Sequence, residues 1–206
     1  MTDYFALLGE SRRPWIDPEE LKAKFLALTA QVHPDRVHNA SEAEKQAASR
    51  RSAEMNAAYN CLREAKTRLL HLLELERGTR PEEVQEIPPA TMDLFTEVSR
   101  LCREADLLFA EKAKATSPLL KVELFAQGMA IDEKLNALRT RLSARHEALT
   151  GQLRFLNLAW ESAPPAGSAA RIHVLPCSRL EQIYREFSFL TRWCRQLQER
   201  SLRLSC

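Results

Sequence analysis

The stretch from Gln31 to Arg36 reads QVHPDR, and it places three residues suited to recognition where an apolar helical pattern stops. Pro34 cannot continue the hydrogen-bond ladder of a helix and restricts the residue before it. The same rigidity holds its neighbours outward, so that Asp35 offers a fixed anion for an arginine and His33 a ring that can donate a hydrogen bond or stack. The tripeptide alone does not separate a helix end from a contact site. The surrounding elements have to decide between the two.

Composition and charge limit the class of protein. The chain has 206 residues, of which 45% are apolar and 28% charged, as is typical of a globular protein with a packed core. Lys and Arg number 30 against 28 Asp and Glu, and this net charge of +2 indicates neither a nucleic-acid nor a membrane partner. No run approaches the roughly 18 apolar residues of a membrane span. The start, MTDYFALLGE, has no signal or transit pattern, so we expect a cytoplasmic protein.

The residue types needed for metal binding or catalysis are not grouped in the sequence. Five cysteines occur without a CxxC pair or another tight ligand spacing, so we expect no metal site, no cofactor and no disulfide framework. No nucleophile with a neighbouring base, no paired carboxylates and no phosphate-cradling loop accompany them. We therefore expect no catalytic residues, and a protein that is not an enzyme.

Ten prolines and only five glycines leave long uninterrupted intervals, which predict an all-helical chain. Asp17-Pro18 has the form of a cap followed by a first-turn proline, and the helix that it opens ends at His33-Pro34. Ser41 and Glu44 form a capping box before a helix expected to run without a break to about Leu75. Its apolar face could pack antiparallel against the stripe of the first helix, which is Leu21, Phe25, Leu28 and Val32.

Three further helices are predicted after a linker rich in proline. Leu94, Val98, Leu101, Ala105 and Leu108 repeat at helical spacing, and a second pattern runs over 119–160, where Gly128 and Gly151 are positions for a bend or an interruption. Residues 161–178 are expected to be a loop. The last helix has an apolar seam formed by Leu180, Ile183, Phe187, Leu190, Cys194, Leu197 and Leu204. The expected organisation is a helical hairpin domain over 1–76, a linker over 77–91 and an antiparallel three-helix bundle over 92–206.

The first domain resembles a J domain, the module that recruits DnaK-type chaperones. The resemblance rests on DYFALLG at the start, on LKAKFLALTAQVHPDR, and on MNAAYNCLREAKTRLLHLL in the helix that follows. The whole chain is similar to the HscB type of J-domain co-chaperone, which serves iron-sulfur cluster assembly, because it adds RLLHLL at 68–73 and the closing IYREFSFLTRWCRQL at 183–197. The implied fold is a J domain with an HPD loop, followed by the bundle.

The resemblance implies a partner for the HPD tip. His33, Pro34 and Asp35 would engage a DnaK or HscA-type chaperone and stimulate its ATPase, with no bond made or broken by this chain. Lys22, Lys24 and Arg36 would add positive charge toward an acidic chaperone surface. The protein would act as a monomer or a weak homo-oligomer.

The resemblance also implies a cargo for the bundle, namely the IscU-like scaffold protein on which iron-sulfur clusters are assembled. The apolar contact falls on Leu94, Phe95 and Val98, together with Phe189, which lies nine residues from Leu180 and is expected to point away from the seam. Of the three acidic positions that flank this face in the family, only Asp106 is an acid here. The other two are Ser99 and Cys102.

Two alternatives remain open. One keeps the J domain but gives the bundle a different client, as the loss of two acids favours. The other is a helical adaptor whose HPD stimulates nothing, because Val32 stands where J domains usually have tyrosine and the common basic positions of the second helix are Leu26, Ala27 and Ala30.

Overall fold

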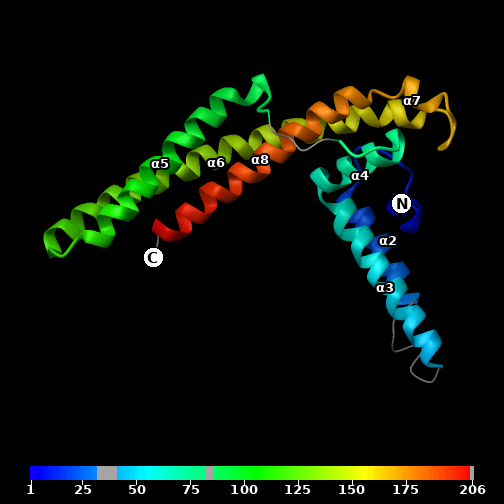
Figure 1. The fold of residues 1–206 in the computed structure, drawn as a ribbon, viewed down its shortest axis with the longest axis horizontal. Helices are drawn as coiled ribbons and strands as arrows, with labels where there is room; N and C mark the ends of the chain where they lie inside the picture. The colour runs from blue at the N-terminus through cyan, green and yellow to red at the C-terminus, as the bar shows by residue number, and fades with distance from the viewer. Residues whose placement is uncertain (32–40, 82–85, 205–206) are drawn as a thin grey trace. The chain divides into compact units, whose positions relative to one another are not determined.

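The computed structural model describes residues 1–31, 41–81 and 86–204. These residues form helices and loops without a strand, so the predicted all-α class is confirmed (Figure 1). Contacts divide the chain into two compact units, one of Met1–Glu82 with Thr150–Tyr184 and one of Glu83–Leu149 with Arg185–Cys206. The predicted domain boundaries at 76 and 91 follow the order of the chain rather than these contacts, and they remain a prediction.

The first unit contains the predicted helical hairpin, formed by α2 (Pro18–Gln31) and α3 (Glu42–Arg63). Both predicted helix starts are confirmed. Asp17 Oδ1 accepts the backbone N–H groups of Glu19 and Glu20 at 2.9 and 3.1 Å, and the capping box at Ser41 is complete. The two helices lie side by side in Figure 1. Phe25 stacks on Tyr59 with ring centroids 4.3 Å apart, and α1 (Tyr4–Leu7), which contains the buried Phe5, packs on α3.

The expectation of one unbroken helix to Leu75 is wrong. Glu64 is extended, and it separates α3 from α4 (Ala65–Arg77). The carbonyls freed at the break are taken up by side chains that follow it: Thr67 donates its hydroxyl to Cys61 O at 2.6 Å, and Arg68 donates to Leu62 O. The break is therefore stabilised by tertiary and side-chain hydrogen bonds, since neither proline nor glycine marks it.

Residues from the later part of the chain complete the first unit. The buried Asn157 exchanges two hydrogen bonds of 2.9 Å with the backbone of Trp15. Short helix α7 (Arg171–Val174) lies in the stretch expected to be loop, and it packs on α4. Arg171 reaches Glu76 with two donors, at 2.8 and 2.9 Å. These contacts explain why segments far apart in the sequence belong to one compact unit.

The second unit is the three-helix part. It is built from α5 (Met92–Lys114), which follows the short 3-10 helix η2 (Pro89–Thr91), and from segments of α6 (Pro118–Glu161) and α8 (Cys177–Leu204). Both α6 and α8 contribute residues to each unit. Helix α6 continues through Gly128 and Gly151, so neither glycine interrupts it. The predicted seam of α8 is buried at six of its seven positions, with Cys194 half-buried.

Ion pairs give the relative directions of the three helices. Glu97 and Glu104 of α5 pair with Arg141 and Lys134 of α6, so the residue numbers fall on one helix as they rise on the other. Asp106 pairs with Arg200, while Phe95 lies against Trp193, so α5 and α8 run parallel. The bundle therefore has α6 antiparallel to two parallel helices, which is the predicted antiparallel arrangement.

Candidate functional site

The HPD residues at the predicted chaperone contact, His33, Pro34, Asp35 and Arg36, lie outside the described residues. The two basic residues on α2 are described, and they differ in their surroundings. Lys24 Nζ lies 2.7 Å from Glu10 Oε1, and the Glu10 side chain is only 1% exposed. Lys22 is exposed. Of the two lysines, Lys22 therefore offers the charge without a bound acid.

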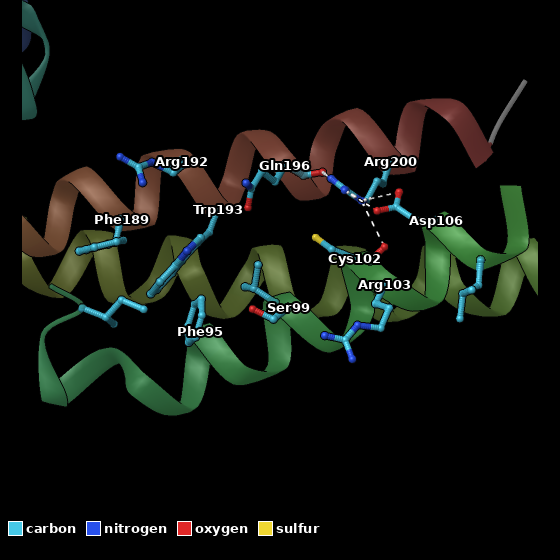
Figure 2. A pocket seen from close by; sticks show the side chains of 13 residues that line it. Phe95, Ser99, Cys102, Arg103, Asp106, Phe189, Arg192, Trp193, Gln196 and Arg200 are labelled. Carbon is cyan, nitrogen blue, oxygen red and sulfur yellow. Dashed lines mark hydrogen bonds and ion pairs between the residues drawn. The ribbon is translucent and has the colours of Figure 1, made fainter. Parts of the chain in front are cut away.

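The predicted scaffold-binding residues gather at a hollow of the second unit. A groove between α5 and α8, here called the α5/α8 groove, has a volume of about 700 Å³. Figure 2 shows it with aromatic side chains at one end and an ion pair at the other. Its lining residues are Ile87, Phe95, Val98, Ser99, Cys102, Arg103, Asp106, Leu107, Phe189, Arg192, Trp193, Gln196 and Arg200.

The aromatic end is built from three rings on two helices. The ring centroids of Phe95 and Trp193 are 6.1 Å apart, and those of Phe189 and Trp193 are 5.4 Å apart. Both pairs are tilted, a geometry that aromatic quadrupoles favour. Arg192 lies over the Phe189 ring, with its guanidinium carbon 5.6 Å from the centroid. Trp193 is 3% exposed and Phe95 is half-buried, so the apolar surface that this end offers is mainly that of Phe95, with a cation at its border.

The other end is polar and already contains a bound pair. Arg200 donates to Asp106 at 2.7 and 3.1 Å and to the backbone carbonyl of Cys102 at 3.3 Å. The hydrogen bond with Asp106 raises the pKa of Arg200. Burial raises the pKa of the Cys102 thiol, so Cys102 presents a neutral sulfur to the groove rather than a reactive thiolate. Asp106 is thus an acid whose charge is countered from within the bundle.

The predicted residues are partly brought together. Phe95, Val98, Asp106 and Phe189 line the groove, whereas Leu94 is half-buried and does not line it. Phe189, expected to point away from the α8 seam, lines the groove but is only 5% exposed. Its ring packs against Trp193.

Sequence reasoning missed the residues that α8 contributes next to Phe189. Trp193, Gln196 and Arg200 follow it at spacings of four, three and four, and all three line the groove. This second helical stripe, one position away from the apolar seam, was the signal that could have identified them. Arg103 and Arg192, at the rim, had no such signal.

Two properties of the described part of the chain bear on other classes of function. Among residues 1–31, 41–81 and 86–204, no three His, Cys, Asp or Glu side chains are placed to hold a metal ion. In the same residues, no helix combines the length and the apolar character needed to cross a bilayer.

Comparison with known proteins addresses the fold. No family model matches the sequence. The structure is similar to that of the chaperone HscB from Vibrio cholerae, with a TM-score of 0.55, 24% sequence identity and coverage of 96% of each chain. It is also similar to the human co-chaperone protein HscB, with a TM-score of 0.59, 20% identity, and coverage of 98% of this chain and 81% of that one. The predicted resemblance is therefore confirmed for the fold: this chain has the fold of the HscB co-chaperones.

Proposed function

We propose that this protein is a J-domain co-chaperone, which stimulates the ATPase of a DnaK or HscA-type chaperone and delivers to it a scaffold protein of iron-sulfur cluster assembly. The observation that supports this most is the similarity of fold to two HscB proteins over nearly the whole chain. It spans both the helical hairpin and the bundle. In this proposal the protein acts in the cytoplasm as a monomer or weak homo-oligomer, and the iron-sulfur cluster is cargo of the partner.

The chaperone contact is assigned to the sequence HPDR at 33–36, which stands between α2 and α3. A proline-fixed tip with an anion and an imidazole can be recognised by a partner at low entropic cost. Lys22 would contribute to the rate of encounter rather than to the lifetime of the complex, since exposed charges act mainly through steering. Lys24 would contribute less, because Glu10 already counters its charge.

The cargo contact is assigned to the α5/α8 groove. Phe95 supplies exposed aromatic surface of the kind enriched in protein interfaces, and the buried Phe189, Trp193 and Val98 support it from below. A cluster of this kind, with polar groups at its border, has the composition of an interface core with its rim.

The test is single-turnover ATP hydrolysis by the cognate chaperone. We expect stimulation by the wild-type chain, loss of stimulation in His33→Gln, and full stimulation in the matched control His38→Gln, which lies in the same segment outside HPD. Addition of the scaffold should raise stimulation further, and Phe95→Ala, at the half-buried ring, should remove only that increase. Absence of stimulation by the wild-type chain would reject the chaperone assignment.

One observation favours a second candidate, a J-domain co-chaperone with another client. Two of the positions that flank the cargo face are Ser99 and Cys102 rather than acids, and Asp106 is bound to Arg200. Stimulation that the scaffold does not change, together with no scaffold binding in a pull-down, would favour this second candidate.

A further inference from the structure

We propose that the α5/α8 groove binds an acidic segment of a partner protein, in which aspartate or glutamate side chains flank an apolar one. This deepens the proposed function and rests on it only in treating the groove as the partner-binding surface. What it adds is the charge of the partner.

The charged side chains that line the groove give it a net positive charge. Among the described lining residues, Arg103, Arg192 and Arg200 face a single acid, Asp106. Arg200 and Asp106 hold each other through two hydrogen bonds and form a neutral pair. Two positive charges remain, on a chain whose total net charge is only +2. The groove therefore concentrates positive charge that the composition as a whole does not indicate.

The remaining two arginines are available to a partner. Arg103 and Arg192 are both exposed, and in the described part of the chain neither has a carboxylate within ion-pair distance. Arg192 lies over the face of Phe189, and among the described residues no acceptor is hydrogen-bonded to its guanidinium. A guanidinium is weakly hydrated and binds a carboxylate through two parallel hydrogen bonds, so it is well suited to an acid at the border of an apolar contact.

The position of these charges favours an acidic amphipathic segment over a basic one. Arg192 lies at the aromatic end, where an apolar side chain would be covered by Phe95, Phe189 and Trp193. A partner has to place an apolar side chain on the rings and an acid beside Arg192 within a few residues of each other. An acidic amphipathic segment does both. A segment rich in lysine or arginine would instead bring like charges together as it covers the rings, a costly arrangement at an interface.

The experiment uses the full chain and two fluorescein-labelled amphipathic peptides, which have the same leucines and phenylalanines but either acidic or basic flanking residues. Binding is measured by fluorescence anisotropy. At about 0.05 M salt we expect the acidic peptide to bind roughly tenfold more tightly than the basic one, and at about 0.5 M salt most of the difference should vanish. The double variant Arg103→Glu/Arg192→Glu should reverse the preference.

A matched control separates the groove from general charge. Arg100→Glu/Arg195→Glu changes the net charge equally on the same two helices, but neither residue lines the groove, so the acidic preference should persist. Equal binding of the two peptides, or a preference that Arg103→Glu/Arg192→Glu leaves intact, would overturn the proposal. So would tighter binding of a single-stranded oligo-dT than of the acidic peptide.

Chaperone stimulation, measured on the same samples without peptide, keeps the two proposals apart. An acidic preference without stimulation would support the groove proposal and reject the assigned chaperone activity. Stimulation without an acidic preference would overturn the groove proposal alone. Because Arg103 and Arg192 are exposed, we expect both charge variants to retain the wild-type far-UV circular dichroism spectrum.

Discussion

Glu76 joins three helices of the first unit, and its removal gives the sharpest test of how that unit is held together. Its side chain is 3% exposed, and it accepts two hydrogen bonds from Arg171, whose side chain is 8% exposed. Trp160 Nε1 donates to the same carboxylate at 3.3 Å, and Arg12 lies 3.9 Å away. Glu76→Ala therefore removes the acceptor shared by Arg171 and Trp160, together with the charge that faces Arg12.

The expected cost follows from what remains in place. Breaking a buried ion pair by removing one partner costs about 3 to 5 kcal/mol, mainly because the other charge is left buried and unpaired. Arg171 still donates to the carbonyl of Pro164 at 2.7 Å, which satisfies one donor. We therefore expect Glu76→Ala to lower the free energy of unfolding by about 3 kcal/mol, toward the lower end of that range. Glu76→Ala/Arg171→Ala removes both charges, so its cost should fall short of the sum of the single variants by about 2 kcal/mol.

Urea unfolding followed by tryptophan fluorescence measures these costs, since Trp160 contacts the carboxylate directly. The matched control is Glu199→Ala, which removes a carboxylate from an exposed pair with Arg195, where the side chains are 61% and 75% exposed. That change should stay within about 0.5 kcal/mol. A loss below about 1 kcal/mol in Glu76→Ala, or costs that simply add in the double variant, would refute the reasoning.

Three further predictions concern the first unit. His71 Nε2 accepts the Tyr4 N–H at 3.1 Å, and burial lowers the pKa of His71. The folded state therefore binds fewer protons than the unfolded state, and the free energy of unfolding should fall as the pH drops below about 6.5. Urea titrations at several pH values should show this dependence in the wild type and a flatter one in His71→Gln. Burial lowers the pKa of Arg68 to about 10, and its guanidinium donates to the backbone carbonyls of Pro14 and Leu62. Arg68→Met leaves both carbonyls without this donor, so it should lower the free energy of unfolding in urea by about 2 kcal/mol. An unchanged urea midpoint would contradict this. Gly78 has a φ of 72°, so Gly78→Ala should lower the free energy of unfolding by about 1 kcal/mol. Gly151→Ala, in the interior of α6, should raise it by about 0.5 kcal/mol. Thermal melts in which both variants shift the melting temperature in the same direction would contradict this.

Local signals in the sequence were sufficient for most helix positions. Asp17 and the Ser41 capping box act on backbone N–H groups within three residues, so their effect can be read without knowledge of the fold. The apolar seam of α8 and the stripe of α5 are periodic over several turns, and their members are buried as that period predicts, except for the half-buried Cys194 and Leu94. Gly151 shows why helix propensity alone is a weak predictor. The free-energy cost of one glycine in a helix is too small to interrupt α6, which packing holds on both sides of this position.

The features that were missed depend on contacts between distant segments. The break at Glu64 has no proline or glycine, and it is stabilised by Arg68, which also donates to the carbonyl of Pro14 at 2.9 Å across 54 positions of sequence. Helix α7 is too short to show a period, and it is held by Arg171 on Glu76. No local pattern contains the partner of either arginine, which is why sequence reasoning treated one segment as continuous helix and the other as loop.

The α5/α8 groove lies between these two cases, because its residues are periodic but their pairing is not local. On α5 the positions 95, 99, 102 and 106 are spaced by four, three and four, and on α8 the positions 189, 193, 196 and 200 have the same spacing. In a bundle of three consecutive helices the first and third run parallel, so two equal stripes can face each other in register along their length. The contacts of Phe95 with Trp193 and of Asp106 with Arg200 are two points of that register. The charge of the groove comes from positions next to these stripes: Arg103 follows position 102 on α5 and Arg192 precedes position 193 on α8, whereas Asp106 and Arg200 neutralise each other. The sign of a partner surface therefore depends on both helices together, and neither stripe alone would have indicated an acidic partner.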